Sequence, residues 1–279
     1  MAAPKTIAAN GAEIPTLGLG TWGLAGKDCA AAVRIALEAG YRHVDTAAMY
    51  GNEEAVGAGL RASGVARDEL FVTTKVWYAD LAPADLRRSA EASLRRLGLS
   101  RVDLLLIHWP NARILLRDTI PALCAAKRAG LARHIGVANF TVALLDEAVA
   151  LADEPIVANQ CEHHPYLDQS AVRAACRRHG VAFVSYCPLG RAHVLRDPAI
   201  RPIAEAHGRT PAQVVLRWHV QQPGVAAIPK SGNPQRIREN VAVWDFALSD
   251  EEMARMSGLA QPDGRMISPS WSPRWDGAK

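Results

Sequence analysis

The chain of 279 residues repeats one pattern eight times, a short apolar run followed by a segment with helical periodicity. Most apolar runs are continuous, which is typical of strands that are buried on both faces. We expect strands at 16–19, 41–45, 70–75, 102–108, 134–137, 156–160, 182–185 and 225–228. We expect helices at 28–39, 53–63, 84–97, 118–129, 142–150, 169–179, 212–220 and 234–240. Eight such units predict an α/β fold, a (β/α)8 TIM barrel.

Three segments lie outside this repeat. Residues 6–15 hold Asn10-Gly11 between two short β-like runs, a strong signal for a hairpin, which we expect to cap the bottom of the barrel. Residues 249–259 form an extra C-terminal helix that begins with a capping box of Ser249 and Glu252. Residues 261–279 are rich in Pro, Gly, Ser and Trp and should be a C-terminal loop. No linker interrupts the chain, so we expect a single domain over 1–279.

The composition excludes several other classes of protein. Hydrophobic residues make up 49% and charged residues 22% of the chain, so it can build a large core. The net charge of +4 is scattered, which argues against nucleic acid as a partner. No apolar run is long enough for a membrane span, and the N-terminus has no secretory signal. Five cysteines without a CxxC pair suit the reducing cytoplasm, and we expect no metal site.

Polar residues stand where the expected strands end. Asp45 ends the second strand and is followed by Tyr50, Lys75 ends the third strand, and His108 ends the fourth. Any one of them alone could be a cap, a surface residue or a packing residue. Asp and Lys, however, are rarely buried unless they are paired, and the carboxyl ends of barrel strands meet at one rim. We therefore expect these four side chains to converge on one site.

The four residue types together suit protonation of an oxyanion. A tyrosine with a pKa of about 10 is a weak acid at neutral pH unless a neighbouring positive charge lowers that pKa. Lys75 can supply the charge, Asp45 can hold the ammonium group, and His108 can donate a hydrogen bond to a carbonyl oxygen. Such an oxyanion forms when a hydride adds to a carbonyl group.

Several longer motifs, in order, carry a resemblance to a known family. They are GLGTW (18–22), HVDTA (43–47), YGNE (50–53), TTK (73–75), DLLLIHWP (103–110), GVANF (136–140) and IPKS (228–231). Over essentially its whole length the chain resembles the aldo-keto reductases. The resemblance implies a TIM barrel that uses NADPH without a Rossmann domain, so the glycines of 18–23 are no dinucleotide fingerprint. It also implies a catalytic tetrad of Asp45, Tyr50, Lys75 and His108.

The same resemblance implies the residues that bind the cofactor. The nicotinamide end would lie on Thr21, Trp22, Asp45, Asn139, Gln160 and Tyr186. Asn139 and Gln160 would bond the carboxamide, and the Tyr186 ring would stack on the nicotinamide. The pyrophosphate would lie near Pro188, Leu189 and Gly190. Lys230, Ser231 and Arg236 would hold the 2′-phosphate, with Glu239 and Asn240 on the adenine, which favours NADPH over NADH.

The substrate pocket would be lined by tryptophans. We expect Trp22, Trp77, Trp109 and Trp271 beside Tyr50, with Trp275 a further candidate, whereas Trp218 and Trp244 should be packing residues. Ala138 replaces the serine usual in the family, which removes one carboxamide hydrogen bond. The loop after Trp109-Pro110 is short, so the site should be open on that side.

Within the family, the short loops and residues 263–269 resemble the bacterial 2,5-diketo-D-gluconate reductases, some of which also reduce methylglyoxal. We therefore expect reduction of a small-molecule carbonyl substrate, an α-dicarbonyl or a diketo sugar acid, by a cytoplasmic monomer. A sugar acid would need a cation such as Arg265 within reach.

Two other functions remain open on the sequence. Lys75 at a barrel strand end could be the Schiff-base lysine of an aldolase. The barrel could also be a cofactor-binding regulatory module with little turnover. The cofactor motifs argue against the first, and the four tetrad residues argue against the second.

Overall fold

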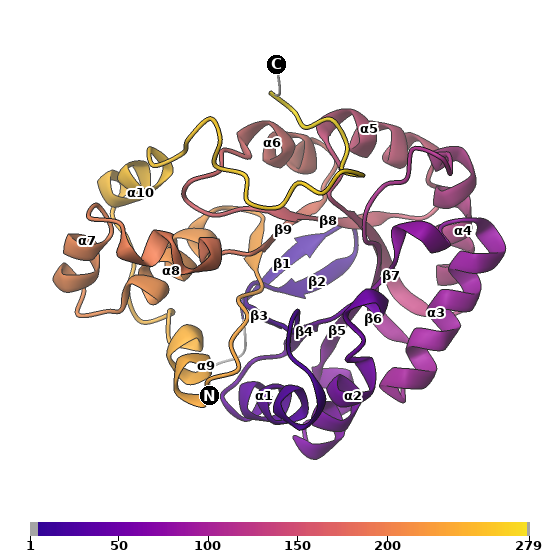
Figure 1. The fold of residues 1–279 in the computed structure, drawn as a ribbon, viewed down its shortest axis with the longest axis horizontal. Helices are drawn as coiled ribbons and strands as arrows, with labels where there is room; N and C mark the ends of the chain where they lie inside the picture. The colour runs from indigo at the N-terminus through magenta and orange to yellow at the C-terminus, as the bar shows by residue number, and fades with distance from the viewer. Residues whose placement is uncertain (1–4, 278–279) are drawn as a thin grey trace.

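Eight parallel strands form a nearly closed barrel in the computed structural model, which describes residues 5–277 (Figure 1). The order follows the chain without a crossover, from β3 (Gly18–Gly20), β4 (His43–Asp45), β5 (Phe71–Val76) and β6 (Val102–Ile107) to β7 (Ala132–Ala138), β8 (Ile156–Glu162), β9 (Ala182–Tyr186) and β10 (Val225–Ala227). A parallel bridge between Leu17 and Ala227 brings the last strand to the first. The expected TIM barrel is confirmed.

Helices surround the barrel and cover its outer face (Figure 1). They are α1 (Gly26–Glu38), α2 (Glu53–Ala62), α3 (Pro83–Leu97), α4 (Leu116–Arg128), α5 (Val142–Leu151), α6 (Ser170–Arg178), α7 (Arg201–Ala206), α8 (Pro211–Gln221), α9 (Pro234–Val241) and α10 (Asp250–Ser257). Apolar side chains from the helices and the outer strand faces form the largest buried cluster. The inner strand faces form a second cluster inside the barrel. Both faces of the strands are buried, which explains their continuous apolar runs.

The N-terminal hairpin closes the bottom of the barrel, as expected. Strands β1 (Thr6–Ala9) and β2 (Ala12–Pro15) are antiparallel, and Asn10 and Gly11 both have positive φ, as a tight hairpin turn requires. The Asn10 amide donates to the carbonyl of Ile156 at 2.8 Å, at the start of β8. In Figure 1 the hairpin lies across the central opening. The open end of the barrel is therefore the carboxyl end of the strands.

The element boundaries differ from expectation in a few places. The second expected strand, β4, begins at His43 and not at residue 41, because the N–H of Tyr41 bonds the carbonyl of Ala36 and terminates α1. Helix α7 was not expected; at six residues it is too short to give a clear period. The capping box of Ser249 and Glu252 on α10 is confirmed.

The C-terminal segment 258–277 has no helix or strand and crosses the open end of the barrel (yellow in Figure 1). It follows α10, which packs with α7 and α8 in a third apolar cluster that contains Trp218. Trp218 is buried and Trp244 packs against the main core, so both are packing residues as expected. Within residues 5–277 no helix is long and apolar enough to span a membrane. The outermost residues, 1–4 and 278–279, of the expected 1–279 domain lie outside the described part.

Candidate active site

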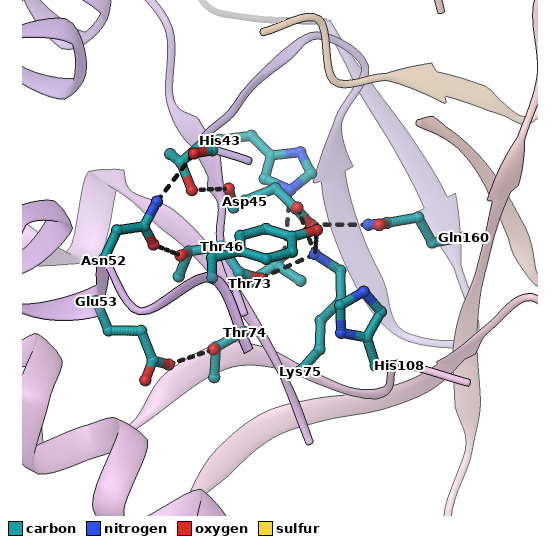
Figure 2. Close-up of polar contacts among 12 residues, drawn as sticks. His43, Asp45, Thr46, Asn52, Glu53, Thr73, Thr74, Lys75, His108 and Gln160 are labelled. Carbon is teal, nitrogen blue, oxygen red and sulfur yellow. Dashed lines mark hydrogen bonds and ion pairs between the residues drawn. The ribbon is translucent and has the colours of Figure 1, made fainter. Parts of the chain in front are cut away.

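The structure brings the four expected catalytic side chains together at the open end of the barrel. Asp45 is the last residue of β4, Lys75 is in β5, and His108 directly follows β6. Tyr50 ends a short 3-10 turn, Ala48–Tyr50, after β4. The Lys75 Nζ atom lies 2.5 Å from Asp45 Oδ1 and 3.3 Å from the Tyr50 hydroxyl oxygen. The Lys75 ammonium group thus contacts both the Asp45 carboxylate and the Tyr50 hydroxyl. Figure 2 shows Lys75 directed toward Asp45.

The ammonium group of Lys75 is fully buried and held by three oxygen atoms. Besides Asp45 and Tyr50, it donates to the carbonyl of Thr46 at 2.8 Å. Burial is the largest single effect and acts to lower the pKa of Lys75, but the charges and hydrogen bonds of Asp45 and Tyr50 together outweigh it, so the pKa of Lys75 lies above the usual value. Lys75 is therefore a charged donor at neutral pH and not a free amine. A buried ion pair of this kind is stable only when its remaining hydrogen-bond donors and acceptors also have partners.

The pKa of Tyr50 differs from the sequence expectation. Lys75 lowers it, as expected, but burial of the phenol raises it more, so the net shift is upward. Loss of hydration disfavours the phenolate more than one lysine at 3.3 Å favours it. The hydroxyl consequently keeps its proton through neutral pH, which is the state that a proton donor requires.

His108 lies beside Tyr50, with the two rings edge to face at a centroid distance of 5.6 Å. Burial and the charge of Lys75 hold the pKa of His108 well below its usual value, so its ring is neutral. Its Nδ1 atom is buried and has no hydrogen-bond partner within residues 5–277. A neutral imidazole next to a phenol can donate one hydrogen bond to a ligand oxygen.

Two amide side chains, Gln160 and Asn139, connect the strand ends. Gln160 on β8 donates to Asp45 Oδ2 at 2.7 Å, so the carboxylate is held by an amide on one side and by Lys75 on the other (Figure 2). The amide of Asn139 donates to the carbonyl of His108 at 2.8 Å and accepts the Tyr186 hydroxyl at 2.8 Å. Among the contacts of residues 5–277, each amide still has one free N–H and free acceptor capacity for a ligand.

Behind this group lies a polar layer that sequence reasoning did not single out. Asn52 accepts from Thr46 at 2.7 Å and donates to the carbonyl of Thr21 at 2.9 Å. Glu53 accepts from Thr74 at 2.5 Å and pairs with Arg96 at 2.6 Å. Figure 2 shows Asn52 and Glu53 reaching the strands from the start of α2. These contacts fix the loop that carries Tyr50.

A cavity of about 1280 Å³ opens above the four side chains. Nearly all of the predicted site residues line it, namely Thr21, Trp22, Asp45, Tyr50, Trp77, His108, Trp109, Asn139, Gln160, Tyr186, Leu189, Lys230, Ser231, Arg236, Glu239, Asn240 and Trp271. Two predicted residues do not line it. Lys75 is fully buried behind Tyr50 and Asp45, and Gly190 is the buried first residue of the turn Gly190–Ala192. The volume exceeds that of a site for one drug-sized ligand and can hold two molecules together.

The cavity has a basic end and an aromatic end. At the basic end Lys230 and Arg236 are exposed beside the start of α9 and form no ion pair within the described residues. Arg191 and Arg196 also line the cavity; sequence reasoning missed both because they lie in an irregular loop after β9. Four cations that line one cavity suit a multiply charged phosphate ligand.

At the aromatic end the C-terminal segment meets the barrel. Trp271 stacks on Tyr78 at 5.4 Å and lies edge to face with Trp77 at 6.1 Å. The exposed Met49 and residues 266–269 complete this wall and were not predicted individually. Trp22 is 59% exposed at the mouth of the cavity. Apolar groups at a cavity mouth indicate a binding surface rather than core.

Arg265 and Trp275 lie outside this cavity. The Arg265 guanidinium stacks on the Trp275 ring at 3.6 Å and lies 3.8 Å from the buried carboxylate of Glu162. Both line a separate small pocket on the other side of the C-terminal segment. The Trp275 indole bonds Ser268 at 2.9 Å and packs edge-on near Trp109. The proposed substrate cation of the sequence analysis is thus engaged elsewhere.

Within residues 5–277 no group of three or more His, Cys, Asp or Glu could hold a metal ion. The site is built instead from a TIM barrel, a buried Lys-Asp pair, a protonated phenol and a large two-part cavity. This combination is that of the TIM-barrel enzymes, which carry their active sites at the carboxyl ends of the strands.

Comparison with known proteins agrees with that class. The profile of the Aldo/keto reductase family matches residues 16–261. Morphine 6-dehydrogenase of Pseudomonas putida is 45% identical over 266 residues, covering 90% of this chain and 89% of that protein. A solved structure provisionally named 2,5-diketo-D-gluconic acid reductase B has a TM-score of 0.97 and 43% identity, covering 98% of both chains. A Bombyx mori aldo-keto reductase, solved in complex with NADP, has a TM-score of 0.87 at 35% identity and covers 93% of this chain and 94% of its own.

The chain belongs to the aldo/keto reductase family and is an oxidoreductase. The family expected from the motifs is therefore confirmed.

Proposed function

We propose that this protein reduces small neutral aldehydes and ketones to alcohols with NADPH, with Tyr50 as the proton donor. The observation that carries the proposal is the Lys75 ammonium, which contacts Asp45 at 2.5 Å and Tyr50 at 3.3 Å beneath the cavity. This contact supplies a charge that stabilises the tyrosinate once the proton has left.

The residues present fit the cofactor. Lys230 and Arg236, which form no ion pair with any described residue, lie beside Ser231 at the basic end, where a 2′-phosphate needs cations. Asn139 and Gln160, which contact His108 and Asp45, each keep a free amide N–H within residues 5–277, and a carboxamide would be recognised there. Tyr186, whose hydroxyl bonds Asn139, presents its aromatic ring to the same cavity. Ala138 has no hydroxyl to offer, so the carboxamide would depend on Asn139 and Gln160. When bound, NADPH supplies the hydride that adds to the carbonyl carbon.

The chain's own groups control the proton. Tyr50 gives its proton to the carbonyl oxygen, so that an O–H bond forms as the C=O double bond becomes single. Lys75 stabilises the resulting phenolate, and Asp45 with Gln160 keeps the ammonium directed toward Tyr50. His108, neutral through its lowered pKa, donates a hydrogen bond that orients the same oxygen. Solvent then returns the proton to Tyr50.

The substrate that suits the aromatic end is neutral. Trp22, Trp77, Trp109 and Trp271 line it, together with Met266 and Ile267. Arg265 is stacked on Trp275 in a separate pocket, so it offers no charge to a sugar acid. Burial of an unpaired carboxylate is costly, which favours methylglyoxal and phenylglyoxal over 2,5-diketo-D-gluconate.

The other two functions are less well supported. A Schiff-base aldolase needs a neutral amine, whereas Lys75 is held as an ammonium by Asp45 and Thr46 and its pKa is raised. A regulatory module needs no open proton-donor site, whereas Tyr50 and His108 both line the cavity.

The test is a substrate panel with NADPH and with NADH. Methylglyoxal and phenylglyoxal should be reduced with NADPH, with a higher kcat/KM than 2,5-diketo-D-gluconate and a preference for NADPH over NADH. Preferred turnover of the sugar acid would contradict the neutral-substrate assignment. No turnover of any carbonyl, or borohydride trapping of an adduct on Lys75, would contradict the reductase assignment.

We propose further that one domain spanning the chain acts as a monomer in the cytoplasm. The five cysteines are all free, and the four in helices and β8 are buried, which suits a reducing compartment. Light scattering in solution should return the mass of one chain, and a dimer mass would contradict the monomer.

A further inference from the structure

One buried carboxylate, Glu162, holds the C-terminal segment against the barrel. It is the last residue of β8 and its side chain is fully buried. Its two oxygens accept the backbone N–H groups of Met266 at 2.7 Å and Ile267 at 2.9 Å. His164 lies 3.0 Å away on the same carboxylate. Hydrogen bonds to an ionised acceptor are among the stronger ones in proteins.

The bonded segment faces the substrate end of the cavity. Met266, Ile267, Ser268, Pro269 and Trp271 line it. Residues 258–277 contain no helix or strand, so no regular hydrogen-bond ladder fixes their position. Glu162 reaches across 104 positions of sequence to Met266 and supplies two of the bonds that hold this wall.

Strand β8 thereby connects the wall to the reaction centre. Side chains two residues apart on a strand point to the same side. Gln160 and Glu162 are two residues apart and therefore lie on the same side of β8. Gln160 holds Asp45 at 2.7 Å, and Glu162 holds the wall through Met266 at 2.7 Å. The distance between the wall and Tyr50 is therefore set through one rigid element.

A second contact supports the same arrangement. The N–H of Gln261 bonds the carbonyl of Tyr166 at 2.9 Å, and Gly264 lies so close to this carbonyl that a methyl group there would overlap its oxygen. Arg265 lies 3.8 Å from Glu162 and balances its charge. The segment is thus fixed immediately before the residues that line the cavity.

We propose that Glu162 is a positioning residue that sets substrate affinity by holding the wall 266–271 over the cavity. This inference rests on the proposed function for its kinetic part only. Glu162 acts through Met266 and Ile267 and does not itself line the cavity.

The test compares Glu162→Gln with Asp103→Asn. A glutamine at 162 keeps the size but has one acceptor oxygen, so in either orientation it loses a backbone N–H from the wall. Asp103 is the matched control because it is a buried strand carboxylate that also accepts a backbone N–H, from Val72 at 2.9 Å. It lies near the amino end of β6, away from the cavity.

Three measurements give the result. In Glu162→Gln the wall 266–271 should spend less time in its position over the cavity, so the KM for phenylglyoxal should rise about tenfold. The kcat and the Kd for NADPH should stay within about twofold of wild type. Amide hydrogen exchange of 264–271 should become faster. Asp103→Asn should change neither KM nor this exchange. Unchanged KM and exchange in Glu162→Gln, or the same changes in both variants, would overturn the proposal.

Two further features keep the test decisive. If Glu162→Gln does not fold, Gly264→Ala displaces the wall while Glu162 stays charged, and it should raise KM in the same way; an unchanged KM would refute the role of the wall. If the wild-type protein reduces no carbonyl, the proposed function fails, but hydrogen exchange still tests whether Glu162 holds the segment.

Discussion

Removing the hydroxyl of Tyr50 tests the proposed chemistry with little change in structure. In Tyr50→Phe the ring remains and can still pack edge to face on His108, at the 5.6 Å seen here. Lys75 loses its longest contact, 3.3 Å, but keeps Asp45 at 2.5 Å and Thr46 at 2.8 Å. The free energy of unfolding should therefore fall by no more than about 1.5 kcal/mol, the usual range for one hydrogen bond.

The effect on catalysis should be much larger. Loss of a positioned general acid typically slows a reaction by about 10² to 10⁴, which corresponds to about 2.7 to 5.5 kcal/mol of barrier. We expect a decrease of kcat in this range for phenylglyoxal, with the NADPH Kd within about twofold. The assay follows NADPH oxidation by absorbance and NADPH binding by fluorescence quenching.

A matched control separates catalysis from stability. Tyr41→Phe removes another buried hydroxyl, which bonds the carbonyl of Ile237 at 3.4 Å and lies outside the cavity. It should change stability by a similar amount and leave kcat unchanged. Turnover of Tyr50→Phe within about tenfold of wild type would refute Tyr50 as the acid. Because the pKa of Tyr50 is raised, the kcat of the wild-type protein should also stay level across neutral pH.

Two more predictions concern the cofactor and stability. Arg236→Ala should raise the Kd for NADPH about tenfold or more and leave that for NADH unchanged, whereas Arg238→Ala, an exposed arginine outside the cavity, should change neither; equal losses for both cofactors would exclude the 2′-phosphate role. Burial lowers the pKa of His219 to about 3, so below about pH 6.5 the unfolded chain binds a proton that the folded chain excludes, and stability decreases with falling pH. Between about pH 7 and 5.5 this histidine alone should cost about 1 kcal/mol in denaturant unfolding, and a pH slope unchanged in His219→Gln would contradict its contribution.

The sequence by itself determined the barrel and the rim where its polar residues meet. Eight short apolar runs, most of them continuous, alternate with amphipathic helices and leave few other folds, and strand ends must share one rim once the sheet closes. Asp45, Lys75 and His108 could therefore be grouped before any contact was known. The hairpin at Asn10-Gly11 and the cap of α10 were equally local signals.

Only the tertiary structure decided which partners these side chains have. Lys75 lowers the pKa of Tyr50, but the net shift also depends on how much protein surrounds the phenol, and burial makes it upward. Arg265 could have faced a substrate, but a ring ten residues further on and a buried carboxylate hold it elsewhere. The bonds from Glu162 to Met266 and Ile267 join distant segments and leave no periodic trace in the sequence. Local patterns fix which face of an element is buried, whereas the burial and partners of a polar group are set by chain segments that meet only in the folded protein.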